Sequence, residues 1–192
     1  MFRWTQPAGR LVTLALLAAC ATDPGVQVES EGPGDHPETA VAIIMAAADG
    51  VIGAREGVVP ALDPGLMDVP RTGRFPSEAD YRAVPPTLRA RYVAAIRERG
   101  LDTLRALPLR EGCSGLLVPP PDKETHGCPA ENLVVLVFDL PENGDSAETW
   151  TVPVFELGYN TRGHAARIME VLVAESPDGP RYTDARNLFF FD

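Results

Sequence analysis

The final third of the chain alternates short apolar runs with turn-forming residues, and this pattern constrains the fold more strongly than any other feature. Residues 133–140, LVVLVFDL, form a largely apolar run with the length of a central β-strand. Three further runs of strand type occupy residues 148–158, 166–175 and 181–191. Because consecutive strands joined by short turns pair antiparallel, the pattern predicts a four-stranded antiparallel meander.

Two dipeptides indicate where this meander reverses direction. Asn143-Gly144 and Asp178-Gly179 are both favoured in tight hairpin turns, since these residue types accept positive φ angles. Pro153 interrupts the second strand and has no N–H to donate to a neighbouring strand. It predicts that this strand, or at least the part around Pro153, lies at the sheet margin.

Two segments before the strands have the apolar period of helices. Residues 38–54 carry one apolar stripe, and a second stripe begins at Pro86 and stops at Gly100, with a short continuation to Leu107. The proline- and glycine-rich residues 55–80 between them predict an ordered loop. Helices followed by hairpins predict an α+β fold class, with N-terminal helices packed on a curved four-stranded antiparallel sheet.

The first 20 residues carry an independent pattern. Arg3 and Arg10 are followed by the apolar residues 11–19, which are too few to cross a bilayer because a spanning helix needs about 20 residues. Leu17-Ala18-Ala19-Cys20 then resembles the lipobox of bacterial lipoproteins. The alternative is an ordinary secretory signal that is cleaved near residue 19.

The lipobox resemblance implies a location and a domain organisation. Residues 1–19 would be a signal peptide, and Cys20 would carry lipid that anchors the protein to a membrane. Because Ala21 rather than aspartate follows, the resemblance implies an outer-membrane protein that faces the periplasm. Residues 20–37, rich in proline, glycine and acids, then form a flexible tether, and residues 38–192 form a single globular domain.

The net charge excludes one class of partner. The whole chain carries a formal charge of −10, and removal of the leader, which has two arginines and no acid, would take this charge to −12. General nucleic-acid binding is therefore not expected, because phosphate neutralisation requires a basic surface. Residues 82–110 are locally basic, with seven arginines, and are either a solvated face that pairs with the protein's own acids or an anion-binding patch.

Two further cysteines flank a turn-rich insert. In an oxidising compartment, with Cys20 occupied by lipid, Cys113 and Cys128 are expected to form a disulfide, worth about 3 kcal/mol for a loop of about 15 residues. The alternatives are a zinc site that uses His126 with both cysteines, for which a fourth ligand is missing, and a Cys-His nucleophile pair. No cofactor is expected.

Candidate site residues come from the strands. An enzyme would use a carboxylate on the concave face of the sheet, and the candidates by strand position are Asp139, Glu156, Glu170 and Asp184, with Tyr182 or His164. Each is expected to be structural or solvated, so no catalytic or metal-binding residue is assigned. A binding domain would instead line an apolar pocket between helix and sheet, and the candidates for this lining are Trp150, Phe155 and Tyr159, which are equally plausible core residues. Leu188–Phe191 predict the last core strand or an exposed apolar patch.

The order of elements resembles the cystatin-like or nuclear-transport-factor-like superfamily. The closing segment, in which Arg181, Tyr182, Asp184 and Arg186 follow the last turn, is similar to the final hairpin of such domains, without their usual tryptophan. That superfamily contains both isomerases and binding modules, so the resemblance implies a fold and not a function.

We therefore expect a cell-envelope lipoprotein that is anchored through lipid on Cys20. Its domain is expected to bind an envelope protein or a small apolar ligand without catalysis. The alternative is a small envelope hydrolase or isomerase that uses a carboxylate in the concave face of the sheet. A purely structural envelope protein is a third hypothesis.

Overall fold

The structure is a computed structural model, and it describes residues 36–107, 132–146, 148–160 and 163–191. These residues lie in one compact unit, Glu31–Asp192. The elements in chain order are α1 (Pro37–Gly53), β1 (Val59–Leu62), the short 3-10 helix η2 (Glu78–Asp80), α2 (Pro86–Glu98), β2 (Asp102–Thr103), β3 (Leu133–Phe138), β4 (Glu142–Asn143), β5 (Thr149–Asn160), β6 (Gly163–Ala174) and β7 (Arg181–Phe191).

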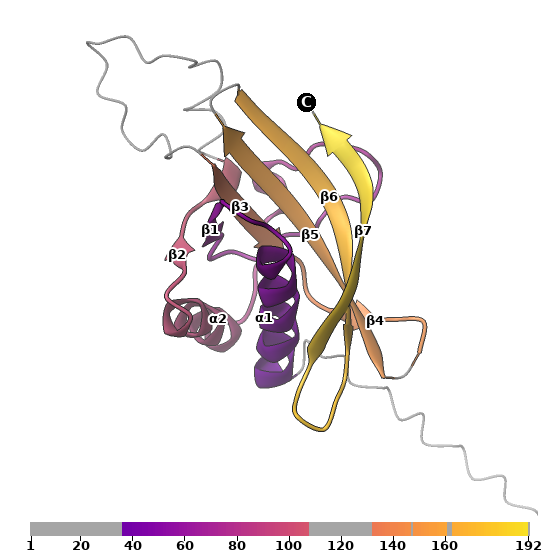
Figure 1. Cartoon of the computed structure of the whole chain (residues 1–192). Helices are drawn as coiled ribbons and strands as arrows, with labels where there is room; N and C mark the ends of the chain where they lie inside the picture. The colour runs from indigo at the N-terminus through magenta and orange to yellow at the C-terminus, as the bar shows by residue number, and fades with distance from the viewer. Residues whose placement is uncertain (1–35, 108–131, 147, 161–162, 192) are drawn as a thin grey trace, which may run out of the picture. The chain divides into compact units, whose positions relative to one another are not determined.

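The described strands form one open mixed sheet in the order β2-β1-β3-β5-β6-β7, with β4 pairing on β5 (Figure 1). The α+β fold class is confirmed. The expected four-stranded antiparallel sheet is wrong in its extent, because β1 and β2 add a parallel portion and β4 adds a short strand. The antiparallel neighbours β3, β5, β6 and β7 correspond to the expected meander.

Strand β1 was not predicted from the sequence, because it contains Pro60. Pro60 is opposite Val134 of β3, whereas β2 pairs only with Ala61 and Leu62 on the other side of β1. Leu62 O accepts the Leu104 N–H and therefore faces β2. Residues two apart on a strand face the same neighbour, so the nitrogen of Pro60 also faces that side, at a level that β2 does not reach. No ladder hydrogen bond is lost. Of the expected helical continuation before Pro108, Asp102 and Thr103 form the strand β2, and only Ala106 and Leu107 are helical.

Pro153 is accommodated in the same way within an interior strand. β5 lies between β3 and β6, so the expectation that the whole strand lies at the sheet margin is wrong. On the β3 side, however, pairing ends at Phe138 with Val154 and resumes only at β4 with Thr151. The Asp139 N–H donates to Pro153 O across this gap, at 2.9 Å. The missing N–H therefore falls just beyond the end of β3, where only one of the two hydrogen bonds of a regular antiparallel pair is formed.

The two expected hairpin turns differ in outcome. Asn143 lies inside β4, and the Gly144 N–H donates to Thr149 O at 2.8 Å, so the Asn143-Gly144 pair opens a wider loop and is not a two-residue turn. The second reversal, between Ala174 and Arg181, occurs where it was predicted, and Gly179 there has a φ of 110°. Only a glycine adopts that angle without strain.

The two helices cover one face of the sheet. α1 packs against β5, β6 and β7, and α2 packs beside α1 (Figure 1). α2 ends in a Schellman motif, in which the Gly100 N–H donates to Arg97 O and the Leu101 N–H to Ile96 O. Gly100 has a φ of 66°, which explains why the helix stops at a glycine.

The sheet has a separate apolar core on each face. The first contains the buried faces of α1 and α2 with alternate residues of the strands, such as Val152 and Val154. The second contains the intervening residues, such as Phe155 and Ile168, and is covered by the proline-rich segment 63–81. Phe75 of this segment meets the rings of Phe155 and Phe191 edge to face, at 5.2 and 5.3 Å between centroids. The expected loop therefore acts as the second covering layer of the sheet.

Strand β7 is an edge of the sheet. Its pairing with β6 slips at two places, so that Thr183 and Leu188 have no partner in the register. Leu188, Phe189 and Phe191 pack against the second core, whereas Phe190 is 69% exposed. The final apolar run is thus a core strand that leaves one aromatic side chain in solvent.

Candidate functional site

Four carboxylates are buried in the part of the chain that the structure describes. Asp63 and Asp139 follow the ends of the parallel neighbours β1 and β3. Glu156 and Glu170 lie within β5 and β6. A buried carboxylate costs free energy unless hydrogen bonds or cations compensate it, so the partners of each one determine what it can do.

Asp63 is fully buried and joins three segments of the chain. Its Oδ1 accepts the Gly65 N–H at 2.8 Å, and its Oδ2 accepts the Ala106 N–H at 2.9 Å and the hydroxyl of Tyr81. Burial raises the pKa of Asp63, and these hydrogen bonds oppose the increase. The Arg105 guanidinium lies 3.7 Å from the centre of the Tyr81 ring and 3.8 Å from Asp63 Oδ1, which adds a compensating charge.

Asp139 is also paired with an arginine, here at hydrogen-bond distance. Arg82 approaches it with Nε at 2.6 Å and Nη2 at 3.2 Å, and the N–H groups of Val69 and Leu140 donate to it at 3.2 and 2.7 Å. Burial raises the pKa of Asp139, and the Arg82 hydrogen bond lowers it. Asp63 and Asp139 together fasten both ends of segment 63–82 to the sheet, which is a structural role.

Glu156 lies on the same face of the sheet as α1. Its Oε1 is 2.8 Å from Arg55 Nη2 and its Oε2 is 2.9 Å from Nη2 of Arg167, its cross-strand neighbour on β6. Burial raises the pKa of Glu156 to about 7, against the opposing charge of Arg55. Glu156 is therefore a carboxyl group that titrates close to neutral pH.

Glu170 lies on the opposite face, among arginines from two other elements. Arg186 of β7 donates from Nε to its Oε2 at 2.6 Å, and Arg71 approaches its Oε1 at 3.3 Å. Arg71 also contacts Glu142 at 2.8 Å. Glu170 therefore joins the sheet to segment 63–81 through a chain of ion pairs.

The structure does not bring the carboxylates predicted as enzymatic candidates together. Asp139 and Glu170 lie on the same face, on either side of Pro153 of β5, but each is held by its own arginine, Arg82 or Arg186. Glu156 is on the opposite face, and Asp184 is exposed. Tyr182 is half-buried against α1, and the side chain of His164 lies outside what the structure describes.

Sequence reasoning missed Asp63 and Tyr81. Asp63 directly follows a run of apolar residues, VVPAL, and this was the available signal. This signal indicates a buried carboxylate at a strand end only when the run is identified as a strand.

The residues predicted to line one pocket also separate. Trp150 packs at the edge of the first core, and Phe155 is fully buried in the second core, on the other face of β5. Successive strand residues alternate between faces, so an even and an odd position on one straight strand cannot line the same pocket. The side chain of Tyr159 lies outside the described residues.

The surface cavities lined by described residues include three that bear on a site. One of about 320 Å³ lies beside segment 68–74 and contains Asp139 and Glu142 in its wall. A groove of about 540 Å³ lies between α1 and α2. A third, of about 260 Å³, lies between the end of α1 and the strands β6 and β7.

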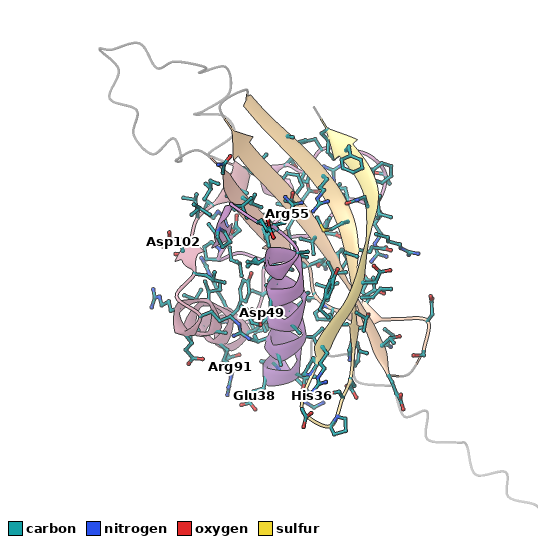
Figure 2. The ribbon with its side chains drawn as sticks, in the orientation of Figure 1. His36, Glu38, Asp49, Arg55, Arg91 and Asp102 are labelled. Carbon is teal, nitrogen blue, oxygen red and sulfur yellow. The ribbon has the colours of Figure 1, made fainter. Side chains whose placement is uncertain are left out.

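The arginine-rich segment pairs extensively with the protein's own acids. Arg91 contacts Glu38 of α1 at 2.7 Å, on the surface between the two helices (Figure 2). Arg99 contacts Asp49 at 3.1 Å. With Arg82 and Arg105 already engaged, these pairs favour a solvated, self-paired face over an open anion patch.

Several predicted features lie outside the described residues, namely Cys20, the tether before residue 36, and the insert that contains Cys113, His126 and Cys128. Within the described ranges, no group of three or more potential ligands is placed to hold a metal ion. No helix in those ranges combines the length and the apolar character that a bilayer crossing requires.

Comparisons of the chain with protein-family models, with curated proteins and with solved structures found no match. Function must therefore be inferred from the side chains of this chain.

Proposed function

We propose that the protein is a lipid-anchored lipoprotein of the cell envelope whose globular part is a non-catalytic binding domain. The apolar residues 11–19 and the Leu17–Cys20 motif support the anchor, with the outer membrane, on its periplasmic side, as the location. The partner is an envelope protein or a small, largely apolar ligand.

One observation favours binding over catalysis. Each of the four buried carboxylates in the described residues is held by at least two donors, which are arginines, backbone N–H groups or the Tyr81 hydroxyl. An acid or base that acts on a substrate must reach the proton that it transfers. Carboxylates that fasten strands and loops to one another are poorly suited to that task.

Glu156 favours a second candidate, an envelope hydrolase or isomerase, because its pKa is raised to about 7. This candidate predicts that the protein cleaves a simple ester such as p-nitrophenyl acetate and that Glu156→Gln abolishes the reaction. Equal rates for the two proteins would remove Glu156 from consideration.

The arrangement of α1 across the antiparallel strands supports the resemblance to the cystatin-like or nuclear-transport-factor-like superfamily. The parallel strands β1 and β2 depart from the expected pattern. We therefore propose the resemblance for α1 and the antiparallel strands, and not for β1 and β2.

Native mass spectrometry of the protein purified from membranes tests the binding function. A native mass above the denatured mass identifies a retained ligand or partner and supports binding. The denatured mass also reports whether two hydrogens are missing, as a Cys113–Cys128 disulfide requires. A zinc-sized excess with both thiols reduced would contradict the disulfide and favour a metal site.

A further inference from the structure

The smallest of the three cavities combines an apolar lining with two arginines. It has a volume of about 260 Å³, and it lies beside Arg55, which Figure 2 shows just beyond the end of α1. Its lining consists of Val51, Ala54, Arg55, Arg167, Met169, Tyr182, Ala185 and Asn187. We call it the Arg55 cavity. Cavities that hold drug-sized ligands begin at about 300 Å³, so this one suits a smaller molecule.

The charge next to this cavity is not balanced. Arg55 and Arg167 bring two positive charges, and Glu156, which both of them contact, brings at most one negative charge. The side chains of Arg55 and Arg167 are only 25% and 22% exposed, so water compensates this charge less well than on an open surface. A single negative charge in the cavity would balance it.

The two guanidiniums also retain unused donors. Arg167 gives Nη1 to Asn187 at 3.0 Å and Nη2 to Glu156, but its Nε is buried and has no hydrogen-bond partner within the described residues. Arg55 approaches a carboxylate there through Nη2 alone. Because the Arg167 Nε has almost no accessible surface, a ligand in the cavity would be attracted by the charge of the guanidinium and not by a bond to this N–H.

We propose that the Arg55 cavity binds a small organic monocarboxylate with an apolar body. The carboxylate meets the two guanidiniums, and the apolar body lies against Val51, Met169 and the ring of Tyr182. When Glu156 is ionised, a monocarboxylate balances the excess of one positive charge, whereas a phosphate dianion would exceed it. This inference rests on the proposed binding function and names the ligand class.

Benzoate and its neutral isostere benzamide are suitable probes for the purified full-length protein. We expect benzoate to shift the NMR signal of the Met169 ε-methyl group saturably, because the benzoate ring would lie beside it. Met67 is buried in the core on the opposite face and serves as the internal control. Benzamide is expected to bind at least tenfold more weakly, since it lacks the charge. A Met169 signal that does not move, or that moves equally with benzamide, would overturn the inference.

A pair of variants tests the arginine directly. Arg55→Gln is expected to weaken benzoate binding at least fivefold by calorimetry, whereas Arg99→Gln, at an exposed ion pair with Asp49, should change it less than twofold. Unchanged affinity in Arg55→Gln would contradict the proposal. Should that variant not fold, the Met169 titration of the wild-type protein decides alone. A negative result with a retained ligand of another class in native mass spectra would refute the monocarboxylate and leave the binding function standing.

Discussion

Replacement of Gly50 in α1 by alanine should destabilise the protein, although the same change normally stabilises a helix. Alanine is favoured over glycine in a helix interior by about 1 kcal/mol. At this position, however, a Cβ atom would lie 2.1 Å from Cγ and 2.2 Å from Cδ2 of Tyr182 on β7. A third contact would join it to Cβ of Tyr182 at 2.5 Å, so the ring must leave the helix surface and β7 must shift with it.

The magnitude follows from two opposing terms. Displacement of a half-buried aromatic ring forfeits about 2 kcal/mol of apolar burial, and the helix preference of alanine returns about 1 kcal/mol. We expect Gly50→Ala to lower the free energy of unfolding by about 1 kcal/mol, which corresponds to roughly 2–4 °C in Tm for a domain of this size. Gly53→Ala is the matched control, because a Cβ there meets no atom within 4 Å. It should be neutral or stabilising.

Urea unfolding followed by tryptophan fluorescence measures both variants. The decisive comparison repeats Gly50→Ala in a Tyr182→Gly background, which removes the ring and also the Tyr182 Cβ that would lie 2.5 Å away, so that the substitution should stabilise by about 0.5–1 kcal/mol. If Gly50→Ala has the same effect in both backgrounds, then the contact between α1 and β7 is not what limits this position, and the reasoning fails.

Three further predictions concern the buried carboxylates and the anchor. Asp63→Ala should cost about 3 kcal/mol, because it leaves the Ala106 N–H and the Tyr81 hydroxyl without their acceptor, whereas the exposed Asp102→Ala should change stability by less than about 0.5 kcal/mol in the same urea assay. The pKa of Glu156 is raised in the folded protein, so protonated Glu156 stabilises the fold fully below its ordinary pKa of about 4.5, and this stabilisation is lost as the pH rises through about 7. The free energy of unfolding should therefore fall between these pH values, and it should fall less in Glu156→Gln. Cys20→Ser should release the protein from the membrane fraction, and continued membrane residence would contradict the lipid anchor.

The helices and the antiparallel meander could be predicted because their signals are local. The stripe of α2 and its stop at Gly100 lie within one short stretch of sequence, and each strand of the meander carries its own apolar run. β1 and β2 could not be predicted, because they are short and depend on pairing with residues far along the chain. Pro60 also argues against a strand unless the absence of a partner at that point is known.

The candidate site was less predictable than the fold. Asp139, Glu156 and Glu170 were identified from their strand positions, but their arginine partners could not be, since Arg55, Arg71 and Arg82 reach them from segments that sequence reasoning treats as loop or solvated surface. Asp63 acquires its role only when β1, segment 63–81 and the residues after β2 come together. Long-range contacts of this kind leave no periodic signal.

The two register slips of β7 have a consequence for behaviour at high local concentration. An open edge strand of 11 residues that ends in exposed Phe190 offers a template on which other chains can add strands and aggregate. The slips at Thr183 and Leu188 divide β7 into three regular stretches, of which the longest is Asp184–Asn187, and each is too short for stable sheet extension. Copies of the chain at high local concentration are therefore poor templates for polymerising through their sheets.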